Sequence, residues 1–402
     1  MLKQILPGKE QIMSCAICAG DTISAIERER IPALQNRVYS SAREARAAQY
    51  GRLEIRVCRR CGYAFNAAFD STVVVYDEHY NNDVPSRTFD QYYQKIATHL
   101  RQRYLQNGGT VLDVGCGKGQ FLQTLTRMFG DIRGIGIDPS CRPYEGDRVK
   151  LIAAEFPQFM PAEIPDLVIC RHTLEHIPNP IKFVRAISAA VPSGTPIFFE
   201  VPDASWIVQN RAFWDWCYEH VNYFVAESAM RALTMANVGR PTSTLAFGGQ
   251  YLWMEGIAGE VAPKTPSRYS PFAHAMLNYA RHEDEYAASI RRQILEWRVA
   301  GYSIAVWGMA TKGIEFVAMV DPEAKLIDHC VDINPLKQEK YTPLSARVIR
   351  SPVVLQQSRL PLIVIVMNPC YLNEIHEECG RMSLNAKCIT MGFENNVKAA
   401  AA

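Results

Sequence analysis

The stretch from Leu112 to Leu125, LDVGCGKGQFLQTL, constrains the fold of this chain more than any other. It joins a short apolar run, predicted to be a strand, to a helical pattern that begins at about Gln120. Between them Gly115, Gly117 and Gly119 alternate, so the backbone can turn tightly and approach a ligand closely. The spacing is G-x-G-x-G, which differs from the G-x-G-x-x-G of nicotinamide-binding proteins. We expect a ligand-binding turn at the edge of a parallel sheet.

Further strand-like runs follow along the chain and alternate with helical patterns. This alternation predicts a parallel sheet that is covered by helices on both faces. Two late runs separated only by Gly248 and Gly249 predict a hairpin, which adds an antiparallel strand near the end of the sheet. The predicted strands cover 110–115, 132–138, 149–154, 166–172, 197–202, 242–247 and 250–257, and a helix is expected around 226–236.

The alternation begins again in the last third of the chain, after a long helical stretch at 271–300. This pattern predicts a second, smaller Rossmann-like domain. Its turn from Gly308 to Gly313 lacks the Lys-Ser/Thr of a phosphate-binding P-loop, and it lacks G-x-G-x-x-G, so a second nucleotide cofactor is unsupported. The strands expected here cover 302–308, 325–332, 362–368 and 387–392.

Two Cys-x-x-Cys pairs, Cys15 with Cys18 and Cys58 with Cys61, dominate the first part of the chain. The segment between the pairs has little continuous hydrophobic period and would make a poor core by itself. Four thiolates can hold one tetrahedral Zn²⁺, and the bound metal supplies folding energy. A catalytic zinc keeps an open position, and a redox pair usually occurs once, so we interpret the four cysteines as a structural zinc site.

These patterns divide the chain into three parts and a short tail. Residues 1–86 form the zinc-binding module and a linker, residues 87–258 the central domain, and residues 259–398 the C-terminal domain. The alanines at 399–402 are interpreted as a cloning scar.

Composition excludes several classes of protein. Apolar residues make up 48% and charged residues 21% of the 402 residues, which is typical of a folded globular chain. The net charge of +2 argues against nucleic acid or an anionic membrane as the main partner. The longest apolar run, at 361–367, is too short to span a bilayer, and the N-terminus lacks a signal core. We therefore expect a cytoplasmic protein in which the other eight cysteines are mostly buried, reduced thiols.

The glycine turn and three later strand ends together resemble class I S-adenosylmethionine-dependent methyltransferases. Ligands bind at the carboxyl ends of strands in open α/β sheets, and the four matching strings all lie at such ends. The resemblance implies that Asp113 faces the amino end of the cofactor, Asp138 accepts both ribose hydroxyls, and Glu155 and Phe156 hold the adenine. The implied cofactor-binding residues are Asp113, Gly115, Gly117, Gly119, Asp138, Glu155, Phe156, Arg171, His172, Leu174 and His176. For the two histidines a purely structural role stays open.

The whole chain is also similar to the three-domain sugar C-methyltransferases, which methylate nucleotide-linked deoxysugar ketones. The strings VWGMATKG (306–313) and DINPLKQEKYTP (332–343) carry this likeness in the C-terminal part. The implied fold is α/β: a class I methyltransferase Rossmann-like sheet, flanked by a small N-terminal zinc module and a second Rossmann-like domain. The implied function is C-methylation of a nucleotide-linked keto-deoxysugar in natural-product sugar biosynthesis, through an enolate generated by a base.

The substrate loop departs from the family pattern. The family reads Tyr-His-Glu-His, whereas this chain has Cys217 and Tyr218 before Glu219 and His220. His220 is the expected base because a neutral imidazole accepts protons near pH 7. Glu219 would orient its ring or bind a hydroxyl, and Tyr218 and Tyr223 would donate to an oxyanion. The alternative is that Glu219 and His220 only tie the loop to the core. The resemblance also places Tyr80 over the acceptor.

The C-terminal domain is expected to bind the carrier end of the substrate. Lys312 and Lys337 are the candidates for phosphate oxygens there, with solvated surface lysines as the alternative. Three further alternatives stay open: O-methylation, C-methylation of another small natural product, and a binding protein that keeps the fold without turnover. We expect a small-molecule substrate, neither nucleic acid nor membrane as partner, and a monomer or dimer.

Overall fold

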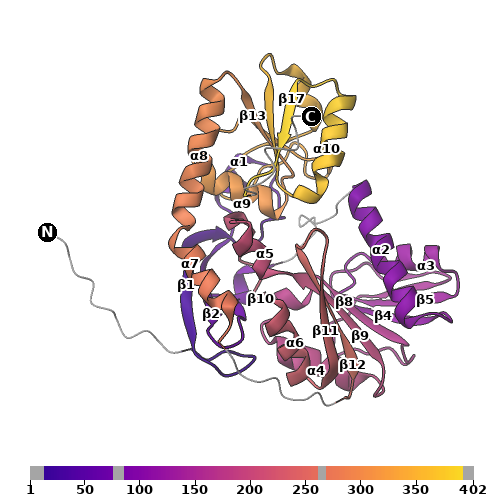
Figure 1. Cartoon of the computed structure of the whole chain (residues 1–402). Coiled ribbons are helices and arrows are strands. Elements are labelled where there is room, and N and C mark those ends of the chain that lie inside the picture. The colour runs from indigo at the N-terminus through magenta and orange to yellow at the C-terminus, as the bar shows by residue number, and fades with distance from the viewer. Residues whose placement is uncertain (1–12, 76–85, 261–268, 393–402) are drawn as a thin grey trace.

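The computed structural model describes residues 13–75, 86–260 and 269–392. These residues form three sheets, each covered by helices (Figure 1). The C-terminal sheet lies at the top of the view and the central sheet at the lower right. The N-terminal strands lie at the lower left, beside the helices that begin the C-terminal part.

The central sheet has the strand order β11-β12-β9-β8-β4-β5-β7-β6. Strands β7, β5, β4, β8 and β9 run parallel to one another, and β12 lies antiparallel between β9 and β11. This arrangement confirms the predicted class I methyltransferase sheet with its terminal hairpin. The strands are β4 (Gly109–Val114), β5 (Ile132–Ile137), β6 (Tyr144–Glu145), β7 (Val149–Ile152), β8 (Leu167–Arg171), β9 (Pro196–Pro202), β11 (Val238–Ala246) and β12 (Tyr251–Ala258).

Helices cover both faces of the central sheet because successive side chains of a strand point to opposite faces. In β4, Val111 packs with the helices of one face and Leu112 with those of the other. Helices α2 (Arg87–Tyr104) and α3 (Gln120–Met128) cover the first face, and α4 (Pro180–Ala190) and α6 (Ala226–Met235) cover the second.

The C-terminal sheet has the order β15-β14-β13-β16-β17, and every neighbouring pair is parallel. This doubly wound order confirms the second Rossmann-like domain. Its strands are β13 (Ser303–Trp307), β14 (His329–Val331), β15 (Ile349–Arg350), β16 (Leu362–Val366) and β17 (Ala386–Ile389). Its helices are α7 (Pro271–Arg281), α8 (Glu283–Val299), α9 (Thr311–Val320) and α10 (Leu372–Arg381).

Two boundaries in this domain differ from expectation. The predicted helix at 271–300 is divided at His282 into α7 and α8. The predicted strand at 325–332 is shortened to β14, because the carboxylate of Asp321 accepts hydrogen bonds from the backbone N–H groups of Lys325 and Ile327. Those amides are therefore unavailable to the sheet.

The first sheet is antiparallel, with the order β1-β2-β3-β10. Its strands are β1 (Thr22–Pro32), β2 (Tyr50–Cys58), β3 (Ala64–Asn66) and β10 (Asn222–Tyr223), and a short helix α1 (Ala42–Arg46) follows β1. Strand β10 comes from the substrate loop of the central part, so the division at residue 86 does not separate the sheets. We expected this segment to make a poor core by itself, and its strands indeed share their core with other parts of the chain. The strands bury side chains in one cluster with α7, α8 and the 204–225 segment, through Ile26, Ile31, Leu53, Ile55 and Val57.

Buried polar contacts tie the N-terminal module to the C-terminal domain. Arg28 on β1 lies 3.0 Å from a carboxylate oxygen of Glu283 and 3.1 Å from one of Glu315. The ammonium of Lys337 donates to the side-chain oxygen of Asn36 at 2.9 Å. On another side of the molecule, Glu374 of α10 accepts hydrogen bonds from the backbone N–H groups of Arg87 and Thr88 at the start of α2.

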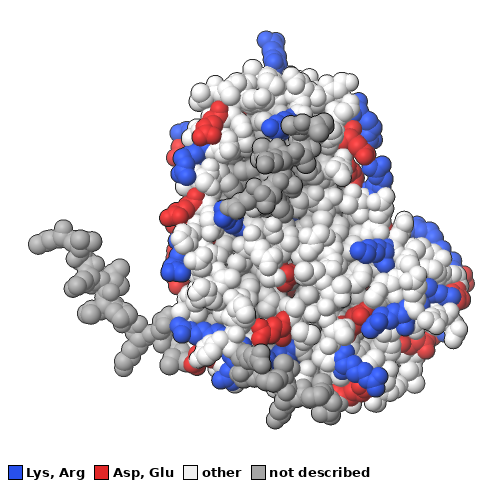
Figure 2. Space-filling view, viewed as in Figure 1, with Lys and Arg blue, Asp and Glu red and all other residues white. Residues whose placement is uncertain are grey.

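Basic and acidic side chains are mixed on the viewed face of the molecule rather than gathered by sign (Figure 2). No helix in the described parts of the chain is both long and apolar enough to cross a membrane.

Candidate active site

One cavity of about 2360 Å³ lies between the two parallel sheets. Its wall on one side comes from the loops that follow β4, β5, β7 and β8 of the central sheet. On the other side the wall comes from the loops that follow β13, β14 and β16. The carboxyl edges of both sheets therefore face the same space, and ligands bind at such edges.

The glycine turn after β4 has the backbone conformation that its sequence predicts. Gly115, Gly117 and Gly119 have positive φ angles of 78°, 53° and 74°. A Cβ on Gly115 would lie 2.1 Å from the hydroxyl oxygen of Thr173, so only glycine fits there. A Cβ on Gly117 would meet nothing within 4 Å, which leaves this backbone open to the cavity. Gly119 is the N-cap of α3 and does not line the cavity.

Asp113 on β4 is a buried carboxylate in the cavity wall, and it is 3% exposed. Its Oδ1 has no hydrogen-bond partner among the described residues. Burial raises the pKa of Asp113 to about 7, although the charge of Arg171 opposes this shift. An ammonium group from a ligand would satisfy this oxygen and favour the ionised carboxylate.

Asp138 follows β5 and also lines the cavity. Its Oδ2 accepts a hydrogen bond from the backbone N–H of Gly117 at 3.0 Å, and its Oδ1 accepts from the N–H and hydroxyl of Ser140 at 2.8 and 2.6 Å. These bonds fix the carboxylate beside the glycine turn. A carboxylate has about four acceptor positions, so capacity remains for ligand hydroxyls.

Glu155 and Phe156 follow β7, and both line the same side of the cavity. The ring of Phe156 is buried and packs edge-on against Phe183, with 5.7 Å between the ring centroids. This arrangement leaves an apolar wall of the kind that a flat heterocycle needs.

Arg171 and His172, at the end of β8, line the cavity but are engaged with protein groups. Arg171 donates to Glu200 at 2.8 Å, and its guanidinium lies over the rings of Tyr93 and Phe121. The Nε2 atom of His172 lies 2.8 Å from Glu200 Oε1. Burial opposes protonation of His172, but the charges and hydrogen bonds of Glu200 and Glu175 together outweigh it and raise the pKa of His172 to about 9. Both residues therefore hold the wall in shape, in line with the structural alternative.

Leu174 does not reach the cavity. It is fully buried in the core beneath the short 3₁₀ helix η2 (Leu174–His176), and only its backbone carbonyl makes a polar contact, with Asn222. The expectation that Leu174 lies near the cofactor was therefore wrong. Its apolar side chain packs into the core, as apolar side chains usually do.

Tyr218 and Tyr223 are likewise absent from the cavity wall. The hydroxyl of Tyr218 accepts from the backbone N–H of Asp70 at 2.7 Å, within the N-terminal module, and its ring fills the space above Gly51. The hydroxyl of Tyr223 donates to the carbonyl of Cys217 and accepts from its N–H, both at 2.8 Å. These contacts overturn the expectation that the two phenols donate to an oxyanion. Tyr80 lies outside the described residues.

His220 does face the cavity, together with Glu219, His176 and Glu175. The described residues offer no hydrogen bond to either ring nitrogen of His220, and its ring stands edge-on to that of His176, with 4.9 Å between centroids. Burial, and next the charge of His176, lower the pKa of His220 to about 3. The ring is therefore neutral at pH 7, as expected. The expectation that it titrates near neutral pH was wrong, because its pKa lies well below that range.

His176 is oriented by the backbone. Its Nδ1 lies 3.0 Å from the carbonyl oxygen of Glu219, so this nitrogen carries the hydrogen in the neutral ring. The Oε2 of Glu219 lies 4.0 Å from the same nitrogen. His176 thus belongs to the histidine and carboxylate cluster of the wall.

The two lysines of the C-terminal domain both line the cavity, and neither is a solvated surface lysine. Lys312 pairs with Asp215, and its ammonium lies 4.9 Å from the ring centroid of Trp206. Lys337 is 2% exposed and donates to Asn36. Because Lys337 joins two parts of the chain, its first role is structural.

Sequence reasoning missed several residues of the wall. They come from the segment after β9 and from helices whose packing was not foreseen. The signal for Asp203 was its position directly after a predicted strand, whereas nothing local singled out the aromatic residues. The missed residues are Tyr93, Phe121, Asp203, Trp206, Asp215 and Tyr251.

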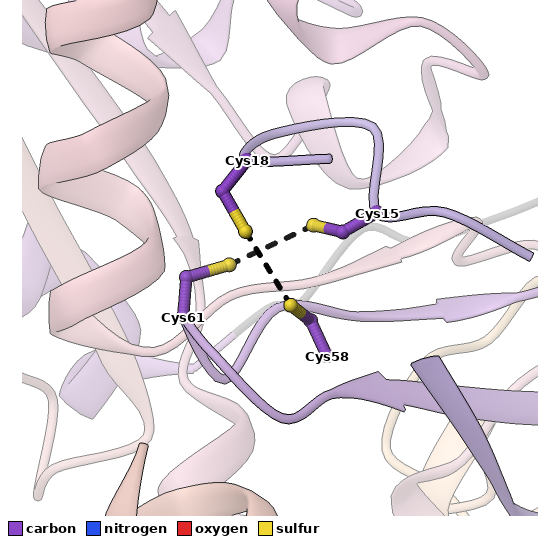
Figure 3. A group of neighbouring side chains, drawn as sticks. All are labelled: Cys15, Cys18, Cys58 and Cys61. Atoms are coloured by element: carbon purple, nitrogen blue, oxygen red, sulfur yellow. Dashed lines mark hydrogen bonds between the residues drawn. The ribbon is translucent and has the colours of Figure 1, made fainter. Parts of the chain in front are cut away.

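The four cysteines of the N-terminal module converge on one point (Figure 3). The Sγ atoms of Cys15 and Cys61 lie 3.6 Å apart, and those of Cys18 and Cys58 lie 3.5 Å apart. Four sulfurs that each bind a central zinc at about 2.3 Å in a tetrahedron lie about 3.8 Å from one another. The cluster therefore fits the dimensions of a closed Zn²⁺ site.

The cavity wall of the central sheet also fits S-adenosylmethionine. The unsatisfied carboxylate oxygen of Asp113 suits an amino group, and the open backbone of Gly117 allows close approach. The fixed carboxylate of Asp138 suits ribose hydroxyls, and Phe156 suits an adenine ring.

Known proteins resemble this chain in two separate regions. The family described as a methyltransferase domain matches residues 88–238, and the family described as a C-methyltransferase C-terminal domain matches residues 268–390. The ubiquinone biosynthesis O-methyltransferase of Proteus mirabilis (strain HI4320) is 31% identical over 137 residues, which cover 29% of this chain and 51% of that protein. The chain thus spans about half the length of that relative.

One relative matches over more of the chain. The C-methyltransferase NovU of Streptomyces niveus is 26% identical over 323 residues, which cover 75% of this chain and 76% of that protein. Among solved structures, the 1,6-didemethyltoxoflavin-N1-methyltransferase of Burkholderia thailandensis is 16% identical with a TM-score of 0.35, and covers 43% of this chain and 80% of that one. The strand order is that of the class I methyltransferase fold, and the two family matches place a methyltransferase domain before a C-methyltransferase C-terminal domain in this chain.

Proposed function

We propose that this protein methylates a carbon next to the carbonyl of a small sugar-like acceptor, and that the acceptor is a keto-deoxysugar linked to a nucleotide. The observation that carries the proposal is the cavity between the two sheets, with the neutral ring of His220 in its wall. The match to a C-methyltransferase C-terminal domain and the likeness to NovU support carbon as the acceptor atom.

The central sheet would hold the methyl donor. Asp113 binds its amino group, Asp138 its ribose hydroxyls, and Glu155 and Phe156 its adenine. When bound, S-adenosylmethionine supplies a methyl group that is already activated by its sulfonium sulfur and accepts an electron pair from the acceptor. The protein then needs to align the acceptor, exclude water and generate a nucleophile.

His220 generates the nucleophile in this proposal. Its neutral imidazole takes the proton from the carbon next to the carbonyl, and the C–H electron pair becomes the enolate. Glu219 lies beside it in the wall and binds an acceptor hydroxyl. With Tyr218 and Tyr223 turned away, Tyr80 is our proposed donor to the enolate oxygen, supported by the family resemblance alone.

The C-terminal domain would hold the nucleotide carrier. The start of α9 and the residues after β14 lie across the cavity from the methyl-donor side. Lys312 is the candidate for a phosphate oxygen, because its charge is available if the phosphate replaces Asp215 as its partner. Helix α9 adds the partial positive charge of its N-terminus.

Zn²⁺ bound by Cys15, Cys18, Cys58 and Cys61 would have a structural role. The ion, when present, would fix the two cysteine loops to each other. Because Cys58 ends β2 and β10 belongs to the same sheet, this order would extend to the loop that carries His220. We also propose a cytoplasmic location, since reduced thiols persist there, and a monomer or dimer without a nucleic-acid or membrane partner.

O-methylation is the alternative that relatives of the methyltransferase domain suggest. The ubiquinone biosynthesis O-methyltransferase matches only 29% of the chain, and thus says nothing of the C-terminal half of the cavity. The test is incubation of the protein and S-adenosylmethionine with a panel of nucleotide-linked 4-keto sugars, followed by mass spectrometry and NMR of the products. We expect a new methyl group on carbon. A methyl ether would favour the alternative. If none of the ketones gives a methylated product, the proposed substrate is wrong.

A further inference from the structure

Glu175 contributes a buried carboxylate to the cavity wall. It lies on η2 and is 1% exposed. Its Oε1 lies 3.5 Å from Nδ1 of His172, whereas its Oε2 has no hydrogen-bond partner among the described residues. An ionised carboxylate rarely stays buried with an unsatisfied oxygen unless the surroundings require its charge.

Three histidines lie near this carboxylate. One ligand atom of each of Glu175, His176 and His220 lies within 4.8 Å of the others, and Nδ1 of His172 lies 3.5 Å from Oε1 of Glu175. Arg171 and His172 both contact Glu200, and His172 also lies near Glu175. A proton taken up by His220 would place one more positive charge beside the buried carboxylate of Glu175.

The other groups that face His220 are less suited than Glu175 to balance the positive charge of a protonated His220 ring. Lys312, from α9, is a cation whose charge disfavours protonation of His220, as does that of His176. Tyr223 of β10 lies 6.1 Å from His220 between ring centroids and has both hydrogen bonds taken by Cys217. Glu219 is directed towards His176, with 4.0 Å between Oε2 and Nδ1.

We propose that Glu175 is the positioning residue of the proton transfer: its buried carboxylate, held by His172, is the counter-charge for the imidazolium that forms when His220 accepts the proton of the acceptor. This inference rests on the proposed function, since it needs a proton to be removed from carbon. Glu175 contacts neither acceptor nor methyl donor in this role. It acts by stabilising the protonated ring, and thereby strengthens a base that burial weakens.

A divalent metal is the other occupant that this cluster suggests, because the three ligand atoms all lie within 4.8 Å of one another. Two histidine nitrogens and a carboxylate oxygen are a ligand set that binds Zn²⁺ in proteins. The metal dependence of the exchange reaction therefore separates this occupant from a proton held by His220.

The experiment isolates the proton step in the full-length protein. The probe is a nucleotide-linked 4-keto sugar that the parent protein methylates, deuterated at the carbon next to the ketone. With S-adenosylhomocysteine bound, no methyl can be transferred, and NMR follows the loss of deuterium to solvent. Turnover and KM are measured separately with S-adenosylmethionine.

We expect Glu175→Gln to slow both deuterium loss and kcat by about 10²-fold, because the charge is removed while the shape stays. KM and the calorimetric affinity for S-adenosylhomocysteine should change less than threefold by this account. Glu175→Asp, which keeps the charge, should recover most of the lost exchange rate. If Glu175→Gln does not fold, the comparison of Glu175→Asp with the His172→Gln variant, which loses the group that holds the carboxylate, still tests the proposal.

Glu255→Gln is the matched control. Glu255 is a buried glutamate that pairs with His99, on the central sheet and outside the cavity wall. The Glu255→Gln variant should exchange deuterium at the same rate as the parent protein. The proposal is overturned if Glu175→Gln exchanges as fast as this control, or if Glu219→Gln slows deuterium exchange at saturating acceptor more than Glu175→Gln does. It is also overturned if dialysed parent protein regains exchange only on addition of Mn²⁺. A parent protein that methylates oxygen without exchange overturns the proposed function instead.

Discussion

At the scale of single residues, strand ends show how far local sequence predicts a site. Asp113 lies next to the end of β4, and Asp138 directly follows β5. Ligands bind at the carboxyl ends of the strands in such a sheet, so the position of each residue along the chain was enough to find it. Tyr218 and Tyr223 could not be placed in this way. They lie in a loop, and the direction of a loop side chain is decided by distant partners, here Asp70 and Gly51.

The first prediction concerns the pH dependence of cofactor binding. Burial raises the pKa of Asp113 to about 7 in the protein without ligand, so the carboxyl is protonated below that pH. Binding of an ammonium group requires the ionised form and releases this proton. Affinity for S-adenosylhomocysteine should therefore fall as pH drops below 7, by up to about tenfold per pH unit, and level off above it. Calorimetry between pH 5.5 and 8.5 measures this.

Asp113→Asn is the control for that titration. It should bind more weakly at pH 8 and lose the dependence on pH, because an amide does not ionise in this range. A parent protein whose affinity is constant across pH 7 would show that Asp113 does not meet the amino group.

The second prediction concerns the base. His220→Asn should lower turnover by about 10²–10⁴-fold with cofactor affinity unchanged, because an amide accepts no proton at a useful pKa. Since burial lowers the pKa of His220 to about 3, the ring stays unprotonated above that pH, and we expect no acid limb from His220 between pH 5 and 8. The measurement is the rate at saturating cofactor over this pH range, for the parent protein and for His220→Asn. An acid limb near pH 6.5 that is present in the parent and absent in the variant would contradict this prediction.

At the scale of elements, the strands of both parallel sheets were predictable because apolar runs alternate with helical patterns. The antiparallel module was not. Its long strands β1 and β2 carry charged residues on the exposed face, and their buried residues pack against α7 and α8, far away in sequence. The two-residue strand β10 was missed for the same reason, because its pairing with β3 is a tertiary contact. Helix α2 was also missed, although Ser86 at its N-cap is a local signal of a helix start.

Zinc removal is the prediction for this element. We expect about one Zn²⁺ per chain by elemental analysis, and we expect chelation or Cys58→Ser to lower the thermal unfolding temperature, because the metal contributes folding energy. Cys370→Ser, outside the cluster, should not. Turnover should fall together with metal content, since β10 joins the zinc-linked sheet to the loop of His220. Protein that is free of zinc yet equally stable would refute the assignment.

At the scale of the whole molecule, the site exists only because three parts of the chain meet. The methyl-donor side belongs to one sheet, the proposed carrier side to another, and buried contacts through the first module hold both. The sequence predicted each domain but not this closure. Arg28 and Asn36 lie far along the chain from Glu283 and Lys337, which they contact, and carry no local signal of that pairing.

The two lysines should therefore behave differently. Lys337→Met leaves the side-chain oxygen of Asn36 without this donor in a buried place, which costs about 1–3 kcal/mol of stability and should appear in denaturant unfolding. Lys312→Ala should raise KM for a nucleotide-linked acceptor with little effect on cofactor affinity. An unchanged KM in the Lys312 variant would remove its phosphate-binding role.

The central claim is that the acceptor loses a proton from carbon to His220 and gains a methyl group there. The most direct measurement uses an acceptor ketone deuterated at the carbon next to its carbonyl and locates methyl and deuterium in the product by NMR. The account predicts a methyl group on that carbon, with its deuterium lost, and no such product from His220→Asn. A methylated oxygen with the deuterium retained on carbon would contradict it.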